Sequence, residues 1–360
     1  MLHAVIMAGG AGTRFWPASR ASTPKQLLSL VGKATMIRQT YERLGDLVTP
    51  QQTLIVTNQR IIDAVSAQLP DLPAEAVVGE PCKRDTAPCI GLAALLVSRH
   101  DPEATMAVMP ADHVIRSAEK FRAAIRQAAT MVENQSEQIV TFGIRPNYAA
   151  EIFGYIQRGA AIDVPHSVAA SHVVKQFREK PDMATAAQYL ASGEYYWNSG
   201  IFIWKAKTII GALAMHQPEM LTHLQKIVAA WGTDQQETVL EIEFSKIKGI
   251  SIDYAVMEHA ENVAVIEAPF DWDDLGSWQS LARLQGKDQH GNTLAGRHIG
   301  LNTQGTIVRS TDNHLIVTLG LEDMIVVHTP DATLVAHKNN EESIRQVVTE
   351  IENRGWIEHL

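Results

Sequence analysis

The chain has 360 residues, of which 46% are hydrophobic and 20% are charged, a length and composition typical of a folded protein with one large domain or two smaller ones. The formal net charge of −9 argues against a nucleic-acid-binding protein, because such proteins usually carry a basic excess. No apolar stretch is long enough to cross a bilayer and the N-terminus has no signal-peptide pattern, so we expect a cytoplasmic protein without a membrane partner. Cys82 and Cys89 are too few for a disulfide framework or a four-ligand zinc site.

The first expected element is a buried strand over residues 4–7, which leads into a glycine cluster within residues 9–12. Glycines let the backbone turn sharply and bring its N–H groups close to a ligand. Two cations, Arg14 and Lys25, follow the cluster, and this combination predicts a loop that holds a polyphosphate. The loop is not a dinucleotide fingerprint, because Phe15 stands where the third glycine would be, and it lacks the G-K-S/T ending of a P-loop.

Short apolar strands and amphipathic helices alternate over the next hundred residues, which predicts a parallel sheet covered by helices on both faces. In such a sheet the ligand crevice lies beyond the carboxyl ends of the strands. Gly9, Glu80 and Asp112 all follow such strand ends, so we expect them to share one site. The expected strands cover residues 53–57, 76–78, 106–109 and 139–143, and the expected helices cover residues 37–44, 61–69, 86–97 and 121–132.

The middle of the chain, residues 150–270, is less regular and reads as a mixed insertion that carries the pocket of a second substrate. Strands are expected at residues 153–157, 173–177 and 200–204, as a second sheet region. Helical segments follow at about residues 213–231 and 251–258.

From about residue 292 short strands alternate with Gly, Asn and Asp turns, which predicts a small all-β unit. The strands are expected at residues 306–308, 315–318, 324–328 and 333–336. A final helix, capped by Asn339 or Asn340, carries an apolar stripe that must pack on its own domain or on a second subunit. We therefore predict a homodimer, with one domain at residues 1–288 and a small C-terminal β domain at residues 289–360 that ends in a helix.

The pattern G-G-x-G-T-R-x-W-P-x-S-R-x-x-x-P-K-Q, read from Gly9 to Gln26, resembles the opening motif of the sugar-1-phosphate nucleotidyltransferases. Its variant with Trp16, Ser19 and Arg20 is most similar to the mannose-1-phosphate guanylyltransferases of that family. The resemblance covers residues 1 to about 280 through at least five ordered motifs. It implies an α/β fold: a Rossmann-like domain with a mostly parallel central sheet, followed by a small C-terminal β domain that a β-helix would fit.

The nucleotide is expected at the glycine loop and at the segment E-P-x-x-R-D-T-A-P. Guanine presents two adjacent donors, N1–H and N2–H₂, which an ionised carboxylate can accept together. Glu80 and Asp85 are both candidates for this role, and a salt bridge between Glu80 and Arg84 is the structural alternative. The expected nucleotide-binding residues are Ala8, Gly9, Gly10, Gly12, Thr13, Glu80, Pro81, Asp85 and Thr86, with Arg14 and Lys25 as catalytic cations on the triphosphate.

Two acidic segments are candidates for a Mg²⁺ site, since Mg²⁺ prefers one or two carboxylates together with phosphate oxygens. Asp112 closes a strand, although it could instead cap the following helix, and D-W-D-D-L-G-S-W could be a plain turn. The family resemblance implies Asp112 and Asp274 as the metal ligands, with Asp273 as the nearest competitor for the second position.

The sugar phosphate is expected at E-K-P and W-N-S-G-I-F, where the resemblance implies that Lys180, the third expected catalytic cation, meets the phosphate and Glu179 the hydroxyls. Asn198 offers both a donor and an acceptor to hydroxyls, and Gly143 would let the sugar approach the backbone. The bland alternatives are a solvated Glu-Lys pair and a turn before a strand. Asp253, in S-I-D-Y-A-V-M-E, is either a helix N-cap or a residue that reaches the active site.

The resemblance implies the reaction of GTP with mannose 1-phosphate to give GDP-mannose and pyrophosphate, assisted by Mg²⁺. Two alternatives stay open: a glucose-1-phosphate thymidylyl- or uridylyltransferase, and a catalytically silent paralogue that binds a nucleotide sugar as a regulator. Longer relatives carry a phosphomannose isomerase domain for which 360 residues leave no room, so isomerase activity is not expected.

Overall fold

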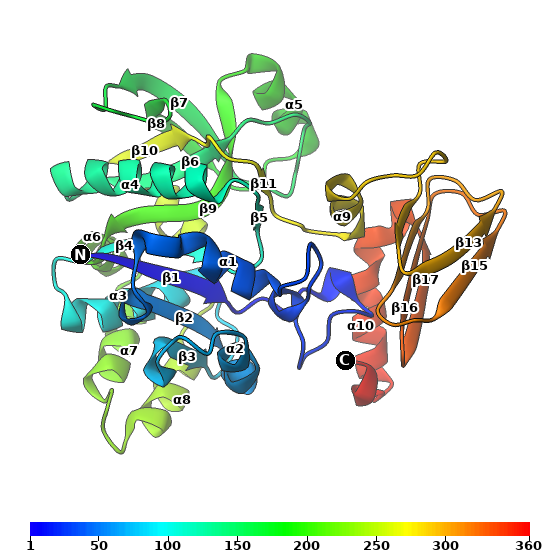
Figure 1. The fold of residues 1–360 in the computed structure, drawn as a ribbon. Helices are drawn as coiled ribbons and strands as arrows, with labels where there is room; N and C mark the ends of the chain where they lie inside the picture. Colours follow the sequence, from blue (N-terminus) through cyan, green and yellow to red (C-terminus); the bar gives the residue numbers. More distant parts are fainter. The chain divides into compact units, whose positions relative to one another are not determined.

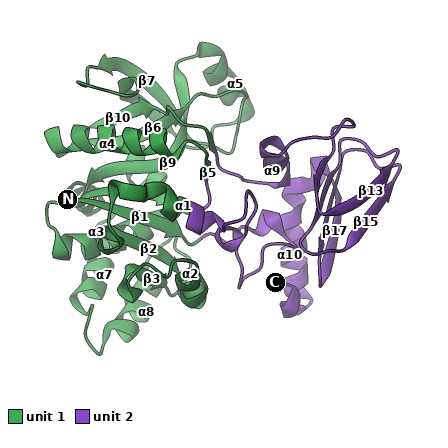
Figure 2. Ribbon diagram, in the orientation of Figure 1, with its two compact units in different colours: residues 1–9, 40–111, 115–272 green, residues 10–39, 112–114, 273–360 purple.

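The computed structural model describes residues 1–360, which form two compact units (Figure 2). The first unit contains residues 1–9, 40–111 and 115–272, and the second contains residues 10–39, 112–114 and 273–360. The chain changes from the second unit to the first within helix α1 (Met36–Leu44), between residues 39 and 40. Each unit is described by itself.

A nine-stranded sheet with the order β3-β2-β1-β4-β9-β6-β10-β8-β7 forms the centre of the first unit (Figure 1). The predicted parallel pairing is confirmed, because β1 runs parallel to both β2 and β4, and β2 runs parallel to β3. The strands are β1 (Leu2–Ala8), β2 (Thr53–Asn58), β3 (Val77–Glu80), β4 (Thr105–Pro110), β6 (Ile139–Ile144), β7 (Tyr155–Ile162), β8 (Ser171–Arg178), β9 (Tyr195–Lys205) and β10 (Val263–Glu267).

Helices of two kinds cover this sheet. Helix α3 is apolar nearly all round, and its buried residues pack in the main core together with those of α6 and α7. Helix α4 is amphipathic and buries one face, which includes Phe121, Ile125 and Val132. The helices of the first unit are α2 (Ile62–Gln68), α3 (Thr86–His100), α4 (Ala118–Asn134), α5 (Met183–Ser192), α6 (Ala206–His216), α7 (Pro218–Ala229) and α8 (Gln236–Lys246).

The prediction of a separate second sheet in the middle of the chain is wrong, because β7, β8 and β9 all belong to the nine-stranded sheet. Strand β9 lies between β4 and β6 and runs antiparallel to both. Its side chains are apolar on both faces, with Phe202 on one and Ile203 on the other, so it suits a position inside the sheet. Periodicity shows that such a segment is a buried strand, but it does not show which strands are its partners.

The C-terminal part of the second unit is a coil of short strands that alternate between two sheets, as in a β-helix, and all pair in parallel except the last strand, β17, which runs antiparallel to β16. One sheet has the order β12-β14-β16-β17 and the other pairs β13 with β15 (Figure 1). The four predicted strands are confirmed as β14 to β17, whereas β12 and β13 were not predicted because Gly296 interrupts their pattern. The strands are β12 (Thr293–Ala295), β13 (Arg297–Leu301), β14 (Ile307–Ser310), β15 (Leu315–Leu319), β16 (Met324–Thr329) and β17 (Ala332–His337).

The predicted terminal helix is present as α10 (Ile344–Asn353), after a 3₁₀ segment at Lys338–Ser343. The predicted cap at Asn339 or Asn340 is wrong, because both residues lie inside the 3₁₀ segment, whose N-cap is His337, and the N-cap position of α10 is Ser343. The apolar stripe of α10 packs on its own unit, where Ile344 and Ile351 are buried in one core with Phe15 and Trp278. Helix α9 (Trp278–Leu284) supplies Trp278 to this core.

No helix of the protein combines the length and apolar character that crossing a membrane requires. Cys82 and Cys89 are free thiols, and Cys89 is buried.

Candidate active site

The chain passes between the two units inside three of the sequence motifs (Figure 2). Three of the five points at which the chain changes unit are those at Gly9–Gly10, at Ala111–Asp112 and at Trp272–Asp273. The predicted site residues therefore divide into a group in the second unit, which holds Arg14, Lys25 and the metal-binding candidates, and a group in the first unit, which holds the base and sugar candidates and the third catalytic candidate, Lys180.

In the second unit the glycine loop is tied tightly to the segment that carries Lys25. Gly12 has a φ of 62°, and a side chain there would overlap the Cβ of Lys25. The Ser19 hydroxyl donates to the Gly12 carbonyl at 2.8 Å. Gly12 is thus required both by its backbone conformation and by the closeness of Lys25. Gly10, by contrast, faces open space, and Thr13 begins a short 3₁₀ turn, Thr13–Phe15.

Lys25 joins the two predicted metal-binding segments. Its side chain is only 7% exposed, and its ammonium donates to Asp112 Oδ2 at 2.7 Å and to the Asp274 carbonyl oxygen at 2.7 Å. Burial alone would raise the pKa of Asp112, but Lys25 and His113 more than offset this and hold that pKa below its usual range. The carboxylate of Asp112 is therefore kept ionised beside a fixed cation.

The two neighbouring aspartates after Trp272 differ in what they contact. Asp273 Oδ1 accepts the Leu275 N–H at 2.7 Å, and Asp273 also pairs with Arg283 at 3.5 Å. Asp274 has its pKa raised to about 6, chiefly by burial and further by Asp273 and Asp112, against the lowering effect of Lys25. Asp273 is thus engaged in the turn, while Asp274 is a buried carboxylate whose neighbouring cations, Lys25 and Arg14, do not fully offset its burial and its acidic neighbours.

Arg14 is held on the other side of this turn. Its Nη1 donates to the Gly276 carbonyl at 2.9 Å, and its Nε lies 3.3 Å from Glu342 Oε2. A Cβ at Gly276 would lie 2.8 Å from Asp274 Oδ2 and 3.2 Å from Arg14 Nη1, so glycine lets both side chains approach. Two cations and two carboxylates therefore meet within one unit, an arrangement suited to binding phosphate groups and a divalent cation.

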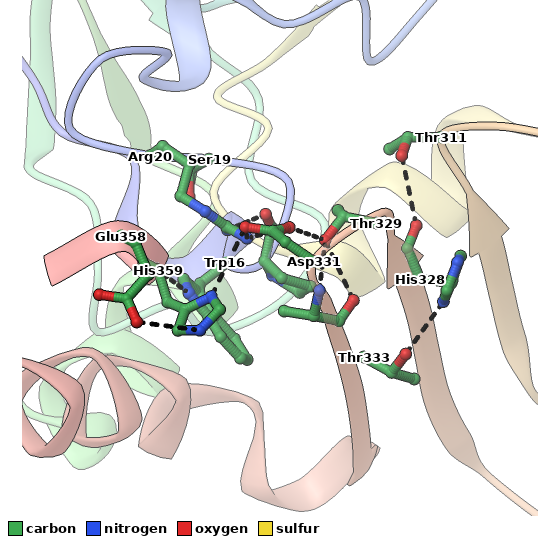
Figure 3. Close-up of polar contacts among 12 residues, drawn as sticks. Trp16, Ser19, Arg20, Thr311, His328, Thr329, Asp331, Thr333, Glu358 and His359 are labelled. Atoms are coloured by element: carbon green, nitrogen blue, oxygen red, sulfur yellow. Dashed lines mark hydrogen bonds and ion pairs between the residues drawn. The ribbon is translucent and has the colours of Figure 1, made fainter. Parts of the chain in front are cut away.

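Asp331 and His359, near the C-terminus, form hydrogen bonds with the loop that carries these cations (Figure 3). Arg20 donates to both carboxylate oxygens of Asp331, at 2.9 and 3.1 Å, and to the Pro17 carbonyl. The Trp16 indole N–H donates to the His359 carbonyl at 2.9 Å. Sequence reasoning used Trp16 and Arg20 only as family markers, and the structure gives them a mechanical role in fixing the loop.

In the first unit the base candidates Glu80 and Asp85 have different environments. Glu80 ends β3, is 7% exposed, and its Oε1 has no hydrogen-bond partner. Burial, reinforced by the charge of Asp85, raises the pKa of Glu80 to about 8. Gly9, at the end of β1 after Ala8, lies against it, because a Cβ there would be 3.3 Å from Glu80 Oε2.

Asp85 and Thr86 are bound within the protein. Asp85 is the N-cap of α3, where its side chain accepts the Thr86 N–H at 2.9 Å. The Thr86 hydroxyl accepts the Ile252 N–H at 2.8 Å. The alternative salt bridge between Glu80 and Arg84 is not formed, since Arg84 donates to the carbonyls of Lys83 and Ser245. Pro81 is half-buried.

The sugar-phosphate candidates lie together in the first unit. Lys180 Nζ donates to Glu179 Oε1 at 2.6 Å, and the Glu179 side chain is only 6% exposed. Burial alone would lower the pKa of Lys180, but the ion pair with Glu179 and the charge of Asp253 more than offset this and raise it. Gly154 was missed by sequence reasoning: a Cβ there would lie 2.5 Å from Glu179 Oε2, so only glycine leaves room for this carboxylate.

Gly143 and Asn198 are paired with each other across β6 and β9. The space that a Gly143 side chain would occupy is filled by the Tyr196 ring, at 2.6 Å from the expected Cβ position. Asn198 Nδ2 donates to Asp253 Oδ1 at 3.0 Å, which brings the undecided Asp253 into this group. The sequence signal for Asp253 was the S-I-D-Y-A-V-M-E motif alone.

Two protein families match the chain: Nucleotidyl transferase over residues 3–291, and MannoseP isomerase/GMP-like beta-helix domain over residues 296–351. The predicted domain boundary after residue 288 stays a prediction. Among curated proteins, a mannose-1-phosphate guanylyltransferase of Escherichia coli (strain K12) is 38% identical over 99% of this chain and 75% of its own length. One of the same name from Klebsiella pneumoniae is 39% identical over 97% of this chain and 73% of its own length.

The fold is also that of a solved structure from Thermus thermophilus, described as a mannose-1-phosphate geranyltransferase. That structure has a TM-score of 0.85 and 33% identity, and the match covers 98% of this chain and 99% of that one. These matches confirm the predicted fold class. The chain therefore belongs to the nucleotidyl transferase family, as a relative of its mannose-1-phosphate guanylyltransferases, and is an enzyme of the nucleotidyltransferase class.

Proposed function

We propose that the protein transfers GMP from GTP to mannose 1-phosphate, giving GDP-mannose and pyrophosphate, in the cytoplasm. The observation that carries the proposal is the Lys25 cluster, in which a buried ammonium contacts Asp112 and the backbone of Asp274. A fixed cation between two acidic segments suits phosphoryl chemistry, where charge must be neutralised and groups positioned. The names of the relatives support the choice of mannose 1-phosphate and of a guanylyl group.

The sugar phosphate is already an anionic nucleophile, so the reaction needs no general base. One of its oxygens forms a new bond to the α-phosphorus of GTP, and the bond from that phosphorus to the β-phosphate oxygen breaks, releasing pyrophosphate. In this proposal Arg14, Lys25 and the backbone N–H groups of the glycine loop bind the triphosphate. Lys180 offsets the charge of the sugar phosphate, and Glu179 and Asn198 contact the sugar. Positioning and charge stabilisation then account for most of the rate.

Members of this family generally use a divalent metal ion, and Asp112 and Asp274 are the residues that would hold it. They fit such a cation because Asp274 is a buried carboxylate whose pKa is raised beside two other aspartates. No group of three or more potential metal-ligating side chains exists in the protein, so phosphate oxygens would complete the coordination. When bound, Mg²⁺ would neutralise charge on the phosphate oxygens.

For the base, Glu80 is favoured over Asp85. The carboxylate of Asp85 already caps α3, whereas Glu80 Oε1 is buried without a donor. The adjacent N1–H and N2–H₂ of guanine would supply the missing hydrogen bonds.

The test is pyrophosphate release with GTP, Mg²⁺ and mannose 1-phosphate, beside reactions in which the nucleotide or the sugar phosphate is changed or EDTA is added. Release only with GTP and mannose 1-phosphate, abolished by EDTA, is the expected result. Faster release with UTP or dTTP and glucose 1-phosphate would mean that these, and not GTP and mannose 1-phosphate, are the substrates. Absence of release in every reaction would instead favour a regulatory nucleotide-sugar-binding protein.

We also propose a homodimer, but not through the terminal helix, whose stripe is covered by its own unit. The outward face of the β13–β15 sheet is apolar where an exposed face is normally polar. Its side chains are 49–69% exposed, and a contiguous exposed apolar face of this kind marks an interaction site. A second copy suits it because the interfaces of homodimers are more apolar than other interfaces. The face consists of Ile299, Leu301, Leu315, Val317 and Leu319.

A further inference from the structure

Asp253 begins an uncommon element, the π-helical turn Asp253–Met257. Such turns often occur at functional sites, where they aim a side chain that a regular helix would direct elsewhere. Here the turn is held from both sides, because the Ile252 N–H donates to the Thr86 hydroxyl and Ala255, Val256 and Met257 are buried. The Asp253 carboxylate is thus supported by rigid structure.

The hydrogen bonds of Asn198 show that it is not the free acceptor that its sequence suggests. Its Oδ1 accepts from the Thr141 hydroxyl and from the Gly200 N–H, both at 3.2 Å. A backbone N–H can only donate, so these contacts also fix which end of the amide is oxygen. The amide nitrogen then donates to Asp253 Oδ1 at 3.0 Å. Asn198 therefore holds Asp253 in place with one N–H while its amide oxygen is already engaged, and its second N–H is left for the sugar.

Carboxylates outnumber cations at this point. Glu179 has its counterion, since Lys180 donates to its Oε1. Asp253 receives Asn198 through Oδ1, while its Oδ2 has no donor from another side chain. Burial, with the charge of Glu179, raises the pKa of Asp253 to about 7 in spite of Lys180, and Asp85 adds a smaller effect in the same direction. In its ionised form Asp253 therefore offers Oδ2 as an acceptor to a hydrogen-bond donor of the ligand, and it would repel a phosphate group.

We propose that Asp253 accepts a hydrogen bond from a ring hydroxyl of the sugar phosphate and is a specificity-determining residue of the enzyme. Asn198 is the positioning residue that orients it. The proposal rests on the proposed function, which supplies a polyhydroxylated sugar whose phosphate meets Lys180 beside this carboxylate. A hydroxyl donates a hydrogen bond without adding charge, which suits a site with a surplus of acceptors.

The test is a double-mutant cycle between Asp253→Asn and mannose 1-phosphate analogues that lack the hydroxyl at C2, C3, C4 or C6. In the wild type, removal of the hydroxyl that Asp253 accepts should lower kcat/KM for the sugar phosphate about 10- to 100-fold, as expected for a hydrogen bond to a charged group. Asp253→Asn should lower kcat/KM for mannose 1-phosphate by a similar factor and leave the KM for GTP unchanged. The same analogue should then cause little further loss in the variant, because both changes remove one contact.

Each of the other analogues should lower kcat/KM of Asp253→Asn by the same factor as in the wild type. A merely structural role of Asp253 would not single out one hydroxyl in this way. Asp253→Ser gives the same cycle with a second side chain, so misfolding of one variant does not decide the outcome. Asp182→Asn is the matched control, since its exposed carboxylate caps α5 in the same part of the chain. It should leave kcat/KM unchanged.

If each of the four analogues lowers kcat/KM by the same factor in the variants as in the wild type, Asp253 does not have the proposed role. The cycle is run with whichever sugar 1-phosphate the wild type turns over. A wild type that turns over none overturns the proposed function as well, whereas turnover without coupling overturns only this inference.

Discussion

The charged groups of the two units are balanced in opposite ways. In the second unit the cations already have anionic or carbonyl partners: Lys25 has Asp112 and a carbonyl, and Arg14 has the Gly276 carbonyl and Glu342. In the first unit buried acceptors are left short of donors, as at Glu80 and Asp253. The difference matches the ligands proposed for each group. Phosphates are acceptors and need cations held in advance, whereas a base edge and sugar hydroxyls are donors and need free acceptors.

The largest effect is expected in the second unit, from removal of a phosphate-binding cation. Lys25→Ala or Arg14→Ala should lower kcat by about 10²-fold or more, by analogy with the loss of one transition-state donor. Steady-state pyrophosphate release measures this, with Lys25→Met as a variant that keeps most of the buried stem. Lys33→Ala is the matched control, because this cation belongs to the same unit but is exposed. A loss of less than tenfold in kcat for Lys25 and Arg14 would remove their assigned roles.

In the first unit Glu80→Gln tests whether the unpaired acceptor reads the base. The substitution should lower kcat/KM for GTP about 10- to 100-fold, since a glutamine cannot accept both guanine donors. UTP should gain relative to GTP, because the amide offers one donor and one acceptor to the N3–H and O4 of uracil. Inosine triphosphate, which lacks the N2 amine, makes the test sharper. If the ratio of GTP to inosine triphosphate turnover is the same in wild type and variant, Glu80 does not contact the base edge.

The unpaired carboxyl of Glu80 should also affect how the stability of the ligand-free protein depends on pH. The folded-state pKa of Glu80 is about 8, above its ordinary value of 4.5, so the folded state keeps a proton that the unfolded state has released. The contribution of Glu80 to stability is therefore present at low pH and is lost as pH rises from about 4.5 to about 8.

Urea unfolding at pH 5 and pH 8.5 should show that the wild type loses on the order of 3 kcal/mol more than Glu80→Gln over this range. The variant serves as the control, since all other titrating groups are shared. Parallel changes in both proteins would mean that Glu80 is ionised without ligand.

The proposed dimer concerns the coil of strands in the second unit. Leu301→Lys or Val317→Lys should convert the dimer to a monomer, because a buried lysine at the centre of an apolar interface lacks a partner. Sedimentation velocity measures the change. Val335→Lys is the control, since Val335 is also exposed but lies on β17, outside the face. A wild type that sediments as a monomer would exclude the dimer.

How far the sequence predicts these features depends on whether a residue acts through its neighbours in the chain. The strand, glycine and cation pattern around Gly12 and Lys25 is local, and the strands and helices around it were predicted correctly. The Asn198–Asp253 hydrogen bond joins residues 55 positions apart, and the position of β9 between β4 and β6 depends on partners elsewhere in the sheet. Neither is encoded in a periodicity. The choice between Glu80 and Asp85 also required burial and caps, which residue type alone does not give.

The smallest effect is expected at the remaining partner of Arg14. Glu342 is 67% exposed, and an exposed ion pair contributes about 1 kcal/mol or less. Glu342→Gln should therefore change kcat by less than about threefold, because the Gly276 carbonyl still holds the guanidinium. Measurements of pyrophosphate release by Glu342→Gln and by Arg14→Ala compare the losses of kcat in the two variants. A loss of about tenfold or more in Glu342→Gln would mean that the cation is held chiefly by the segment before α10, and that the C-terminal strands and helix take part in positioning the triphosphate.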